Sequence, residues 1–208
     1  MTPRYKKSIK SDAMQKTRQL LLEAAAEEFA RNGYDKANIN RIAESAGFSI
    51  GTVYNYFPSK RDLMFSFIDE TAQKHVDYMI DQVKLEENPS RQIITFFNAG
   101  FAFVEMNITP MKAILNALNG PNEEYKERLY QAYLHLFQLL SEDVIPEGIA
   151  SGDFRQVDPL TTSRLIMQIY LGTSSQLSPE GKPWIDHTQV ADFVLHSLKC
   201  GIKEHRDE

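Results

Sequence analysis

The amino-acid sequence predicts an all-α protein, in which a small N-terminal three-helix unit is linked by a long helix to a larger helical body. Apolar residues recur at three- and four-residue steps through most of the chain, which is the spacing of one helix face. No convincing run alternates apolar and polar residues as a half-buried strand does. Caps and glycines also follow one another closely between residues 33 and 62, which indicates short helices joined by tight turns.

The composition is globular, and the charge is unevenly distributed. Of the 208 residues, 42% are hydrophobic and 25% charged, and the chain is long enough to bury a sizeable core. The net charge is -5, yet residues 1–63 hold eleven Lys and Arg against seven Asp and Glu, whereas the remainder holds twelve against twenty-one. A basic N-terminal third suggests a region that meets a polyanion, beside an acidic region with another task.

Targeting and redox signals are few. The single cysteine, Cys200, excludes an intrachain disulfide and fits a small apolar helix residue in a reducing compartment. No apolar run approaches the roughly 20 residues of a membrane span. The N-terminus has charges but lacks the apolar segment of a signal peptide. We therefore expect a cytoplasmic protein.

The first predicted helix covers residues 16–32 and ends at Gly33, a residue suited to the position after a helix. The polar, basic segment 1–12 precedes it. That segment fits either a frayed tail or a flexible arm that adds phosphate or minor-groove contacts beside a DNA-reading helix.

Two short helices follow, over residues 39–46 and 50–56. Asn38 can cap the first of them, Gly47 closes it, and Ser49 can cap the second. A helix of this length is not stable alone, so packing must hold it, through Val53 and Phe57.

The remaining chain predicts longer helices. Pro58 ends the second short helix, and Ser59 with Asp62 has capping-box spacing, with Asp in place of Glu. Pro146 should kink or break the helix that it ends, because it lacks a backbone donor, and the segment GIASGDFRQVD (148–158) reads as a turn region. The expected helices cover residues 60–84, 91–106, 110–119, 123–144, 159–174 and 188–203.

The second short helix has the composition of a surface pressed against a partner. It carries small, hydroxyl and aromatic side chains where a solvent-facing helix usually carries Lys and Glu. Gly51 costs about 1 kcal/mol of helix stability relative to Ala, which suggests close backbone approach by a partner. Thr52 can bond a phosphate or a base, and Tyr54 offers a hydroxyl. Lys60 lies in a first helical turn, where a cation is unfavourable unless an anion such as a phosphate is near.

This region resembles the DNA-binding domain of TetR-type transcriptional regulators. The resemblance extends over residues 16–65 and concerns layout only beyond them. The matching positions are Arg18, Leu21, Leu22, Ala24, Ala25, Phe29, Ala30, Gly33, Tyr34, Ile42, Ala43, Ala46, Gly47, Ser49, Gly51, Thr52, Tyr54, Tyr56, Phe57, Lys60 and Leu63. The chain departs from the family pattern at Ala37-Asn38, where two threonines are frequent, and at Phe48, where a small aliphatic residue is usual.

The resemblance implies a dimer whose paired reading helices enter successive major grooves of a palindromic operator. Ile50, Thr52 and Tyr54 would then lie in the groove with Asn40 near its edge, while Asn38, Tyr56 and Lys60 contact phosphates. Ile50 brings no hydrogen bond, so apolar contact with thymine methyl groups is expected there. The full set of expected DNA-binding residues is Asn38, Asn40, Ser49, Ile50, Gly51, Thr52, Tyr54, Asn55, Tyr56 and Lys60.

The resemblance further implies a C-terminal body that binds a small-molecule effector and forms the dimer. The middle helices are rich in aromatic residues, which are either core or the lining of an effector site. Glu105 either meets a cationic ligand or points to solvent. Candidate effector residues are Phe67, Phe97, Phe101, Glu105, Met111, Tyr133, Phe137 and Gln168. Candidate dimer residues on the last two helices are Met167, Tyr170, Leu171, Val190, Phe193, Val194 and Ser197.

The sequence thus favours a ligand-responsive transcriptional regulator, most often a repressor in this family. We expect residues 1–62 to bind DNA and residues 63–208 to bind effector and dimerise. The helix over residues 60–84 would act as the lever between them. The five scattered histidines and the absence of a nucleophile or phosphate-loop motif argue against an enzyme, so no catalytic residues, metal or cofactor are expected. The other alternative is a helical protein-interaction adaptor without specific DNA binding.

Overall fold

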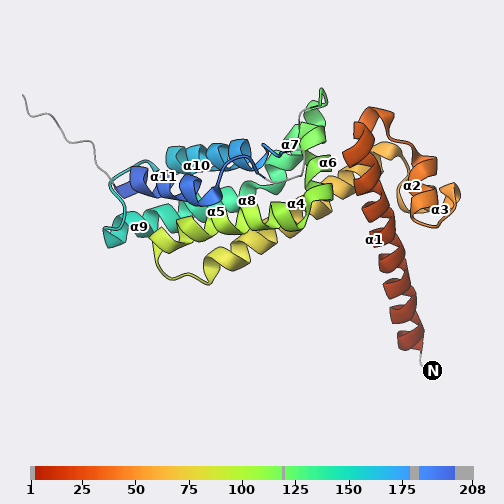
Figure 1. The fold of residues 1–208 in the computed structure, drawn as a ribbon. Coiled ribbons are helices and arrows are strands. Elements are labelled where there is room, and N and C mark those ends of the chain that lie inside the picture. Colours follow the sequence, from red (N-terminus) through yellow and green to blue (C-terminus); the bar gives the residue numbers. More distant parts are fainter. Residues whose placement is uncertain (1–2, 119, 179–182, 200–208) are drawn as a thin grey trace, which may run out of the picture. The chain divides into compact units, whose positions relative to one another are not determined.

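The computed structural model describes residues 3–118, 120–178 and 183–199, with side chains from residue 11 onward, and confirms the all-α fold (Figure 1). Within these residues no strand forms, although Leu177 and Pro183 make an isolated β-bridge. The helices are α1 (Pro3–Lys36), α2 (Ile39–Ser45), α3 (Ile50–Tyr56), α4 (Lys60–Lys84), α5 (Pro89–Met106), α6 (Ile108–Leu118), α7 (Glu123–Ala132), α8 (Leu134–Gln138), the π-helix η1 (Leu139–Val144), α9 (Ile145–Ser151), α10 (Pro159–Ser174) and α11 (His187–Lys199). Cys200 lies outside the described residues.

The chain folds as two compact units. The head unit comprises Met1–Thr71 and Thr109–Tyr130, and the body unit comprises Ala72–Ile108 and Gln131–Glu208. The long helix α4 therefore supplies residues 60–71 to the head unit and residues 72–84 to the body unit. The head unit also includes most of α6 and α7, a grouping that local sequence patterns do not predict.

Helix α1 is longer than expected. Its backbone is helical from Pro3, so the expectation of a tail or flexible arm over residues 1–12 is wrong for residues 3–12. Proline is well tolerated in a first helical turn, and the following residues include no further helix breaker. The prediction that the helix ends near residue 32 is confirmed, because Gly33 adopts φ 69° and ψ 173° and interrupts the helical backbone.

The core of the head unit comes from the apolar stripe of α1 and from one face of each short helix. Leu21, Phe29, Ile42, Val53 and Leu63 are at most 1% exposed. Burying a side chain of this size contributes roughly 1.5–3 kcal/mol each. These contacts explain how two helices of seven residues each persist, although neither would form in isolation.

Helices α6 and α7 are tied to the head unit by polar contacts. The Asn116 amide donates to the backbone carbonyls of Phe29 and Ala30, at 3.3 and 3.2 Å, near the end of α1. Arg128 on α7 donates both Nε and Nη2 to the carboxylate of Asp69 on α4, each at 2.6 Å. The contacts join elements far apart in the sequence into one unit.

The prediction of a single helix over residues 123–144 is wrong. The backbone breaks at Tyr133 (φ -86°, ψ 1°) and then passes through the π-helix η1 before α9. Pro146, in the first turn of α9, has no N–H to donate. The wider π-turns just before it accommodate this gap, and the Ile145 N–H bonds the Leu140 carbonyl, five residues back.

The side chains of His75, Tyr133 and Tyr170 form a buried hydrogen-bonded chain in the body unit. His75 on α4 lies between two tyrosines, with Nδ1 2.6 Å from the Tyr133 hydroxyl and Nε2 2.8 Å from the Tyr170 hydroxyl. All three are less than 10% exposed. A neutral imidazole has one donor and one acceptor, so both ring nitrogens are satisfied. Burial lowers the pKa of His75 to about 4, which keeps the ring neutral at pH 7.

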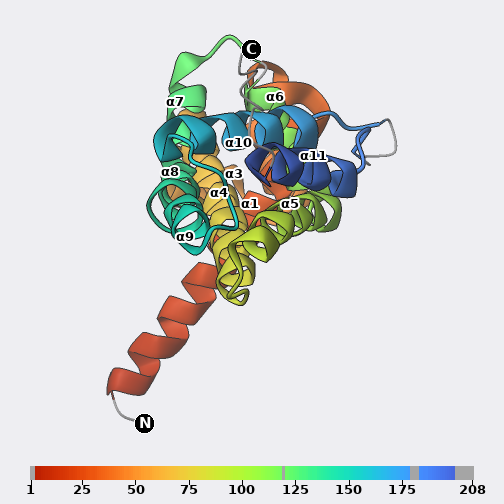
Figure 2. The same ribbon diagram turned by 90° about the vertical axis from the view of Figure 1, so that its left-hand side faces the viewer.

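Residues 148–151 of the segment predicted as a turn region belong to α9, so the prediction is wrong for them, while residues 152–158 are non-helical and bond to two other helices of the body unit. After Gly152 (φ 80°), Asp153 accepts hydrogen bonds from Asn88 and Ser90 at the start of α5. Arg155 donates its backbone N–H to Leu198 and its Nε to Ser197, both near the end of α11. In Figures 1 and 2, α10 and α11 lie side by side.

Candidate nucleic-acid interface

The short helix α3 is held at its start by the cap that the sequence predicts. The Ser49 Oγ accepts from the Thr52 N–H at 3.1 Å and lies 2.9 Å from the Thr52 hydroxyl. Gly47 turns the chain before it with φ 76°, a conformation that glycine adopts without strain. The buried side chains of Val53 and Phe57 anchor the helix, as predicted.

The opposite surface of α3 is exposed and free of charged side chains. Ile50 is 42% exposed and Tyr54 46%, while Gly51 and Asn55 are also exposed. A Cβ added at Gly51 would meet only the Ser49 Oγ, at 3.7 Å, which is ordinary contact. Packing within the protein therefore does not require glycine here, and the bare backbone faces outward.

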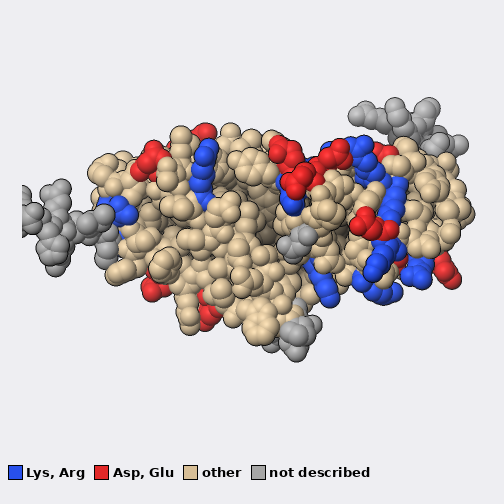
Figure 3. Space-filling view, turned by 90° about the horizontal axis from the view of Figure 1, so that it is seen from above, with Lys and Arg blue, Asp and Glu red and all other residues tan. Residues whose placement is uncertain are grey.

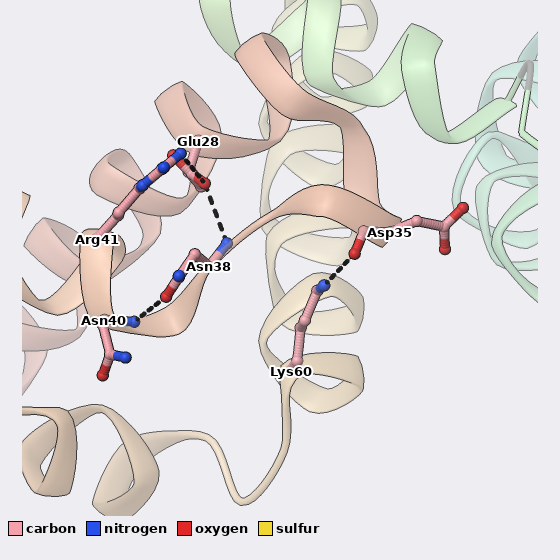
Figure 4. A network of polar contacts seen from close by, with 6 residues as sticks. All are labelled: Glu28, Asp35, Asn38, Asn40, Arg41 and Lys60. Carbon is pink, nitrogen blue, oxygen red and sulfur yellow. Dashed lines mark hydrogen bonds and ion pairs between the residues drawn. The ribbon is translucent and has the colours of Figure 1, made fainter.

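Helix α2 begins at a residue that is capped from two directions. The Asn38 side chain accepts from the Asn40 N–H at 2.8 Å, which confirms the predicted cap. The Asn38 N–H itself donates to the carboxylate of Glu28, at 3.0 Å (Figure 4). Glu28 is 5% exposed, lies on α1 and was not among the residues predicted from the sequence. An acidic residue beside apolar neighbours gave no local signal of this long-range contact.

Lys60 makes contacts within the protein that account for its position. Its Nζ donates to the Asp35 carbonyl at 3.1 Å and lies 4.7 Å from the centre of the Tyr34 ring (Figure 4). A carbonyl at the end of α1 and an aromatic face both favour a cation. An ammonium group has three N–H donors, so this contact leaves others for a phosphate.

Charge on the visible face follows the asymmetry of the sequence. In Figure 3, Lys and Arg side chains gather over the surface of the head unit, whereas the surface of the body unit carries few of them. Within the head unit, Tyr56 is half-buried with its ring centre 6.4 Å from that of Phe57. The candidate interface therefore combines the uncharged side chains of α3 with Lys and Arg donors on the surface of the same unit.

The candidate effector residues come from both units. Phe67 and Met111 are buried in the head unit, and the others belong to the body unit. Glu105 and Gln168 are both exposed. The body-unit aromatics are Phe97 and Phe101, fully buried, Tyr133, bound to His75, and Phe137, half-buried.

The candidate dimer residues divide into an inner and an outer group. Met167, Tyr170, Val190 and Val194 are buried within the protomer. Their apolar spacing marks the face that packs on the core, which sequence periodicity alone cannot distinguish from a face that meets a partner. Leu171 is half-buried, while Ser197 and Phe193 are exposed, Phe193 to 66%. Leu160 and Leu165 on α10, which the prediction left out, are 56% and 60% exposed.

These observations define a helix-turn-helix protein of the class that reads DNA with a short helix carried on an all-helical chain. Among the described residues, no three His, Cys, Asp or Glu side chains group as metal ligands would. None of the helices in the described part of the chain is both apolar enough and long enough to cross a bilayer.

Comparison with known proteins identifies the family. Residues 21–67 match the family model described as bacterial regulatory proteins, tetR family. The fatty acid metabolism regulator protein of Bacillus subtilis is 24% identical over 177 residues, which cover 85% of this chain and 88% of that protein. The chain belongs to the TetR family of transcriptional regulators.

Two solved structures share the fold. The regulator FadR from Bacillus subtilis in complex with stearoyl-CoA aligns with TM-score 0.75 at 22% identity, covering 88% of this chain and 98% of that one. AibR in complex with isovaleryl coenzyme A and operator DNA aligns with TM-score 0.69 at 18% identity, covering 88% and 97%. This chain therefore shares the fold of both proteins over nearly the whole of their chains, in its body unit as well as in its short helices.

Proposed function

We propose that this chain is a cytoplasmic, ligand-responsive transcriptional repressor that binds a palindromic DNA operator as a homodimer and is released by a small-molecule effector. The observation that carries the proposal is α3, whose outer surface of Ile50, Gly51 and Tyr54 is exposed and uncharged. That helix is fixed from behind by Val53 and capped by Ser49. A rigid helix with a bare face is what direct reading of a major groove requires.

Each residue of the interface has a proposed role. Ile50, Thr52 and Tyr54 read bases, with Asn40 and Asn55 at the groove edge. Asn38, Tyr56 and Lys60 hold phosphates and so set the register of the helix on the duplex. We assign DNA binding to residues 1–62, and effector binding and dimerisation to residues 63–208, with α4 as the lever between the two functions.

Dimer formation is proposed to use the outer faces of α10 and α11. Leu160, Leu165 and Phe193 are each more than half exposed. Large apolar side chains that stay exposed on neighbouring helices are candidates for an interaction surface. The paired protomers would place two copies of α3 one helical turn of DNA apart, the spacing that a two-fold operator requires.

The proposed effector class is an acyl-coenzyme A thioester. Support comes from the relatives, since FadR was solved with stearoyl-CoA and AibR with isovaleryl coenzyme A. An effector of this kind acts only if it binds the DNA-incompetent state more tightly than the competent one.

The proposal is tested by selecting genomic fragments with the purified protein and measuring operator affinity by fluorescence anisotropy. Tyr54→Ala should weaken operator binding at least about tenfold, the cost of losing one good base contact in each of two heads. Tyr130→Ala is the matched control, because Tyr130 is an exposed tyrosine on α7 of the same unit, 62% exposed. Binding should weaken steeply with salt, and absence of any salt-dependent shift would support an adaptor instead.

The effector arm of the experiment titrates the operator complex with acyl-CoA thioesters of short and long chains and with free coenzyme A. Release by one chain-length range, with no release by free coenzyme A, is the expected result. Equal release by all compounds, or by none, would contradict the proposed effector class.

A further inference from the structure

The head unit buries one carboxylate beside the expected DNA contacts. Glu28 lies on α1 and is 5% exposed. A buried carboxylate is costly unless hydrogen bonds and an opposite charge compensate it. Here it accepts the Asn38 N–H at 3.0 Å, and the Arg41 guanidinium lies 3.9 Å away (Figure 4). The carboxylate is thus directed at the first residues of α2.

The contact completes a capping box whose second member comes from another helix. In a capping box, a Glu or Gln three residues after the N-cap reaches back to the N-cap N–H. The N-cap of α2 is Asn38, and the residue three positions later is Arg41. Glu28, ten residues before Asn38, provides the missing acceptor across the interface between α1 and α2.

This arrangement fixes the start of α2 without placing a negative charge on its surface. A glutamate at position 41 would be exposed, as Arg41 is, next to a surface proposed to meet phosphates. The carboxylate of Glu28 is instead buried and paired. In Figure 4 the side chain of Arg41 extends toward Glu28, whereas that of Asn40 extends away from it.

We propose that Glu28 is a positioning residue for DNA binding, which acts by holding the backbone of Asn38 so that Asn38 and Asn40 present their side chains in one arrangement. This inference rests on the proposed function. Losing the acceptor lets the start of α2 populate other arrangements, and apparent affinity falls by the fraction of heads that remain competent. Two heads bind each operator, so a loss of about threefold per head becomes about tenfold for the dimer.

The test compares three variants of the full-length protein on the selected operator. Glu28→Ala removes the acceptor, Glu28→Gln keeps an acceptor oxygen and removes the charge, and Glu27→Ala removes the same charge from the exposed neighbouring position. Operator affinity and its salt dependence are measured at a temperature where circular dichroism shows each variant fully folded. Hydrogen exchange at the Asn38 amide reports the contact itself.

The expected direction separates positioning from charge. Removing a negative charge from a DNA-binding protein strengthens binding by long-range electrostatics, so Glu27→Ala should tighten binding slightly, by less than about twofold. Glu28→Ala should instead weaken it about tenfold, with faster exchange at Asn38 and an unchanged salt slope, because no phosphate contact is lost. Glu28→Gln should stay within about twofold of the unaltered protein, because the acceptor remains.

Three outcomes would overturn the inference. They are unchanged or tighter operator binding by folded Glu28→Ala, failure of Glu28→Gln to restore affinity, and a reduced salt slope in Glu28→Ala. Failure of the unaltered protein to bind any operator would instead contradict the proposed function, so the two failures are distinguishable.

Discussion

The head unit and the body unit each contain long-range polar contacts, and the two sets differ in kind. In the head unit, α4 and α7 are joined by exposed ion pairs, Arg128 with Asp69 and Arg61 with Glu124, whose side chains are 40–56% exposed. In the body unit, the corresponding long-range contact is the neutral chain through His75, which is 1% exposed. The ion pairs between α4 and α7 are charges that water and salt reach, whereas the chain through His75 consists of hydrogen bonds that they do not reach.

This difference indicates which contacts of each unit can rearrange at low cost in free energy. Exposed ion pairs contribute roughly 0–1 kcal/mol and are screened by salt, so the contacts of α7 in the head unit can be remade at low cost. A buried hydrogen-bonded chain is costly to break, since each polar group left without a partner costs about 1–3 kcal/mol. We therefore expect the interior of the body unit to be the more rigid of the two.

Removing the imidazole should give the largest effect. His75→Ala leaves the hydroxyls of Tyr133 and Tyr170 buried without their partner and opens a cavity. We expect a loss on the order of 4 kcal/mol in the free energy of unfolding, measured by urea denaturation. Tyr170→Phe, which removes one hydroxyl and keeps the ring, should cost only about 1.5 kcal/mol. Equal losses for both variants would show that packing, and not the hydrogen-bonded chain, dominates.

Acid should weaken the body unit through the same residue. Burial lowers the pKa of His75 from 6.5 to about 4, so the unfolded chain binds a proton more readily than the folded one. The stability from neutral His75 is complete above pH 6.5 and is lost as the pH falls from 6.5 toward 4. The loss attributable to this group is about 3 kcal/mol between pH 7 and pH 4. Denaturation at several pH values should show that His75→Gln lacks this component of the pH dependence.

A methyl group at Gly100 should disrupt the hydrogen-bonded chain through His75 by displacing the Tyr170 ring. A Cβ there would lie 2.5 Å from Cε2 and 2.7 Å from the hydroxyl of Tyr170, so the ring must move. Gly100→Ala should cost about 2 kcal/mol in unfolding free energy, as overpacked cores do. Gly172→Ala is the matched control, because nothing lies within 4 Å of its added Cβ, and it should stabilise α10 by up to about 1 kcal/mol.

The smallest effect should come from the head unit. A double-mutant cycle on Arg128 and Asp69 should give a coupling below about 1 kcal/mol in dilute buffer, even though the pair is bidentate. In 1 M salt the coupling should nearly vanish. A coupling that persists at high salt would contradict the contrast between the two units and would indicate a contribution from the Phe65 ring, 4.4 Å from the Arg128 guanidinium carbon.

The sequence predicts the helix-turn-helix of α2 and α3 well because the sequence signals for it are local. Asn38 and Ser49 cap helices a few residues away, Gly47 supplies a turn that favours glycine, and Phe57 is buried as expected. Each of these contacts links residues within a few positions of one another, so spacing alone reveals them. The individual DNA-contact roles stay predictions, since no bound operator tests them.

The parts that sequence patterns miss depend on long-range partners. Glu28 and His75 look like an ordinary surface acid and an isolated histidine until the fold brings Asn38 to one and two tyrosines to the other. Sequence patterns also do not distinguish the buried dimer candidates from the exposed ones, for a related reason. Met167 and Phe193 are both apolar helix residues, and only packing shows that the first is buried and the second 66% exposed.

The π-helix before Pro146 also changes the direction in which the side chains that follow it point around the helix axis. Each π-turn takes up about one residue more than an α-turn, so side chains after it are rotated by roughly 100° relative to an uninterrupted α-helix. Leu139, Leu140 and Ser141 are consecutively buried, as are Val144 and Ile145, which one regular helical face does not allow. Deleting one residue within 139–144 would restore a regular helix while turning the buried face of α9, including Gly148, away from Phe154. The π-helix thus sets the rotation of α9, so that the apolar faces before and after it are directed at the same core.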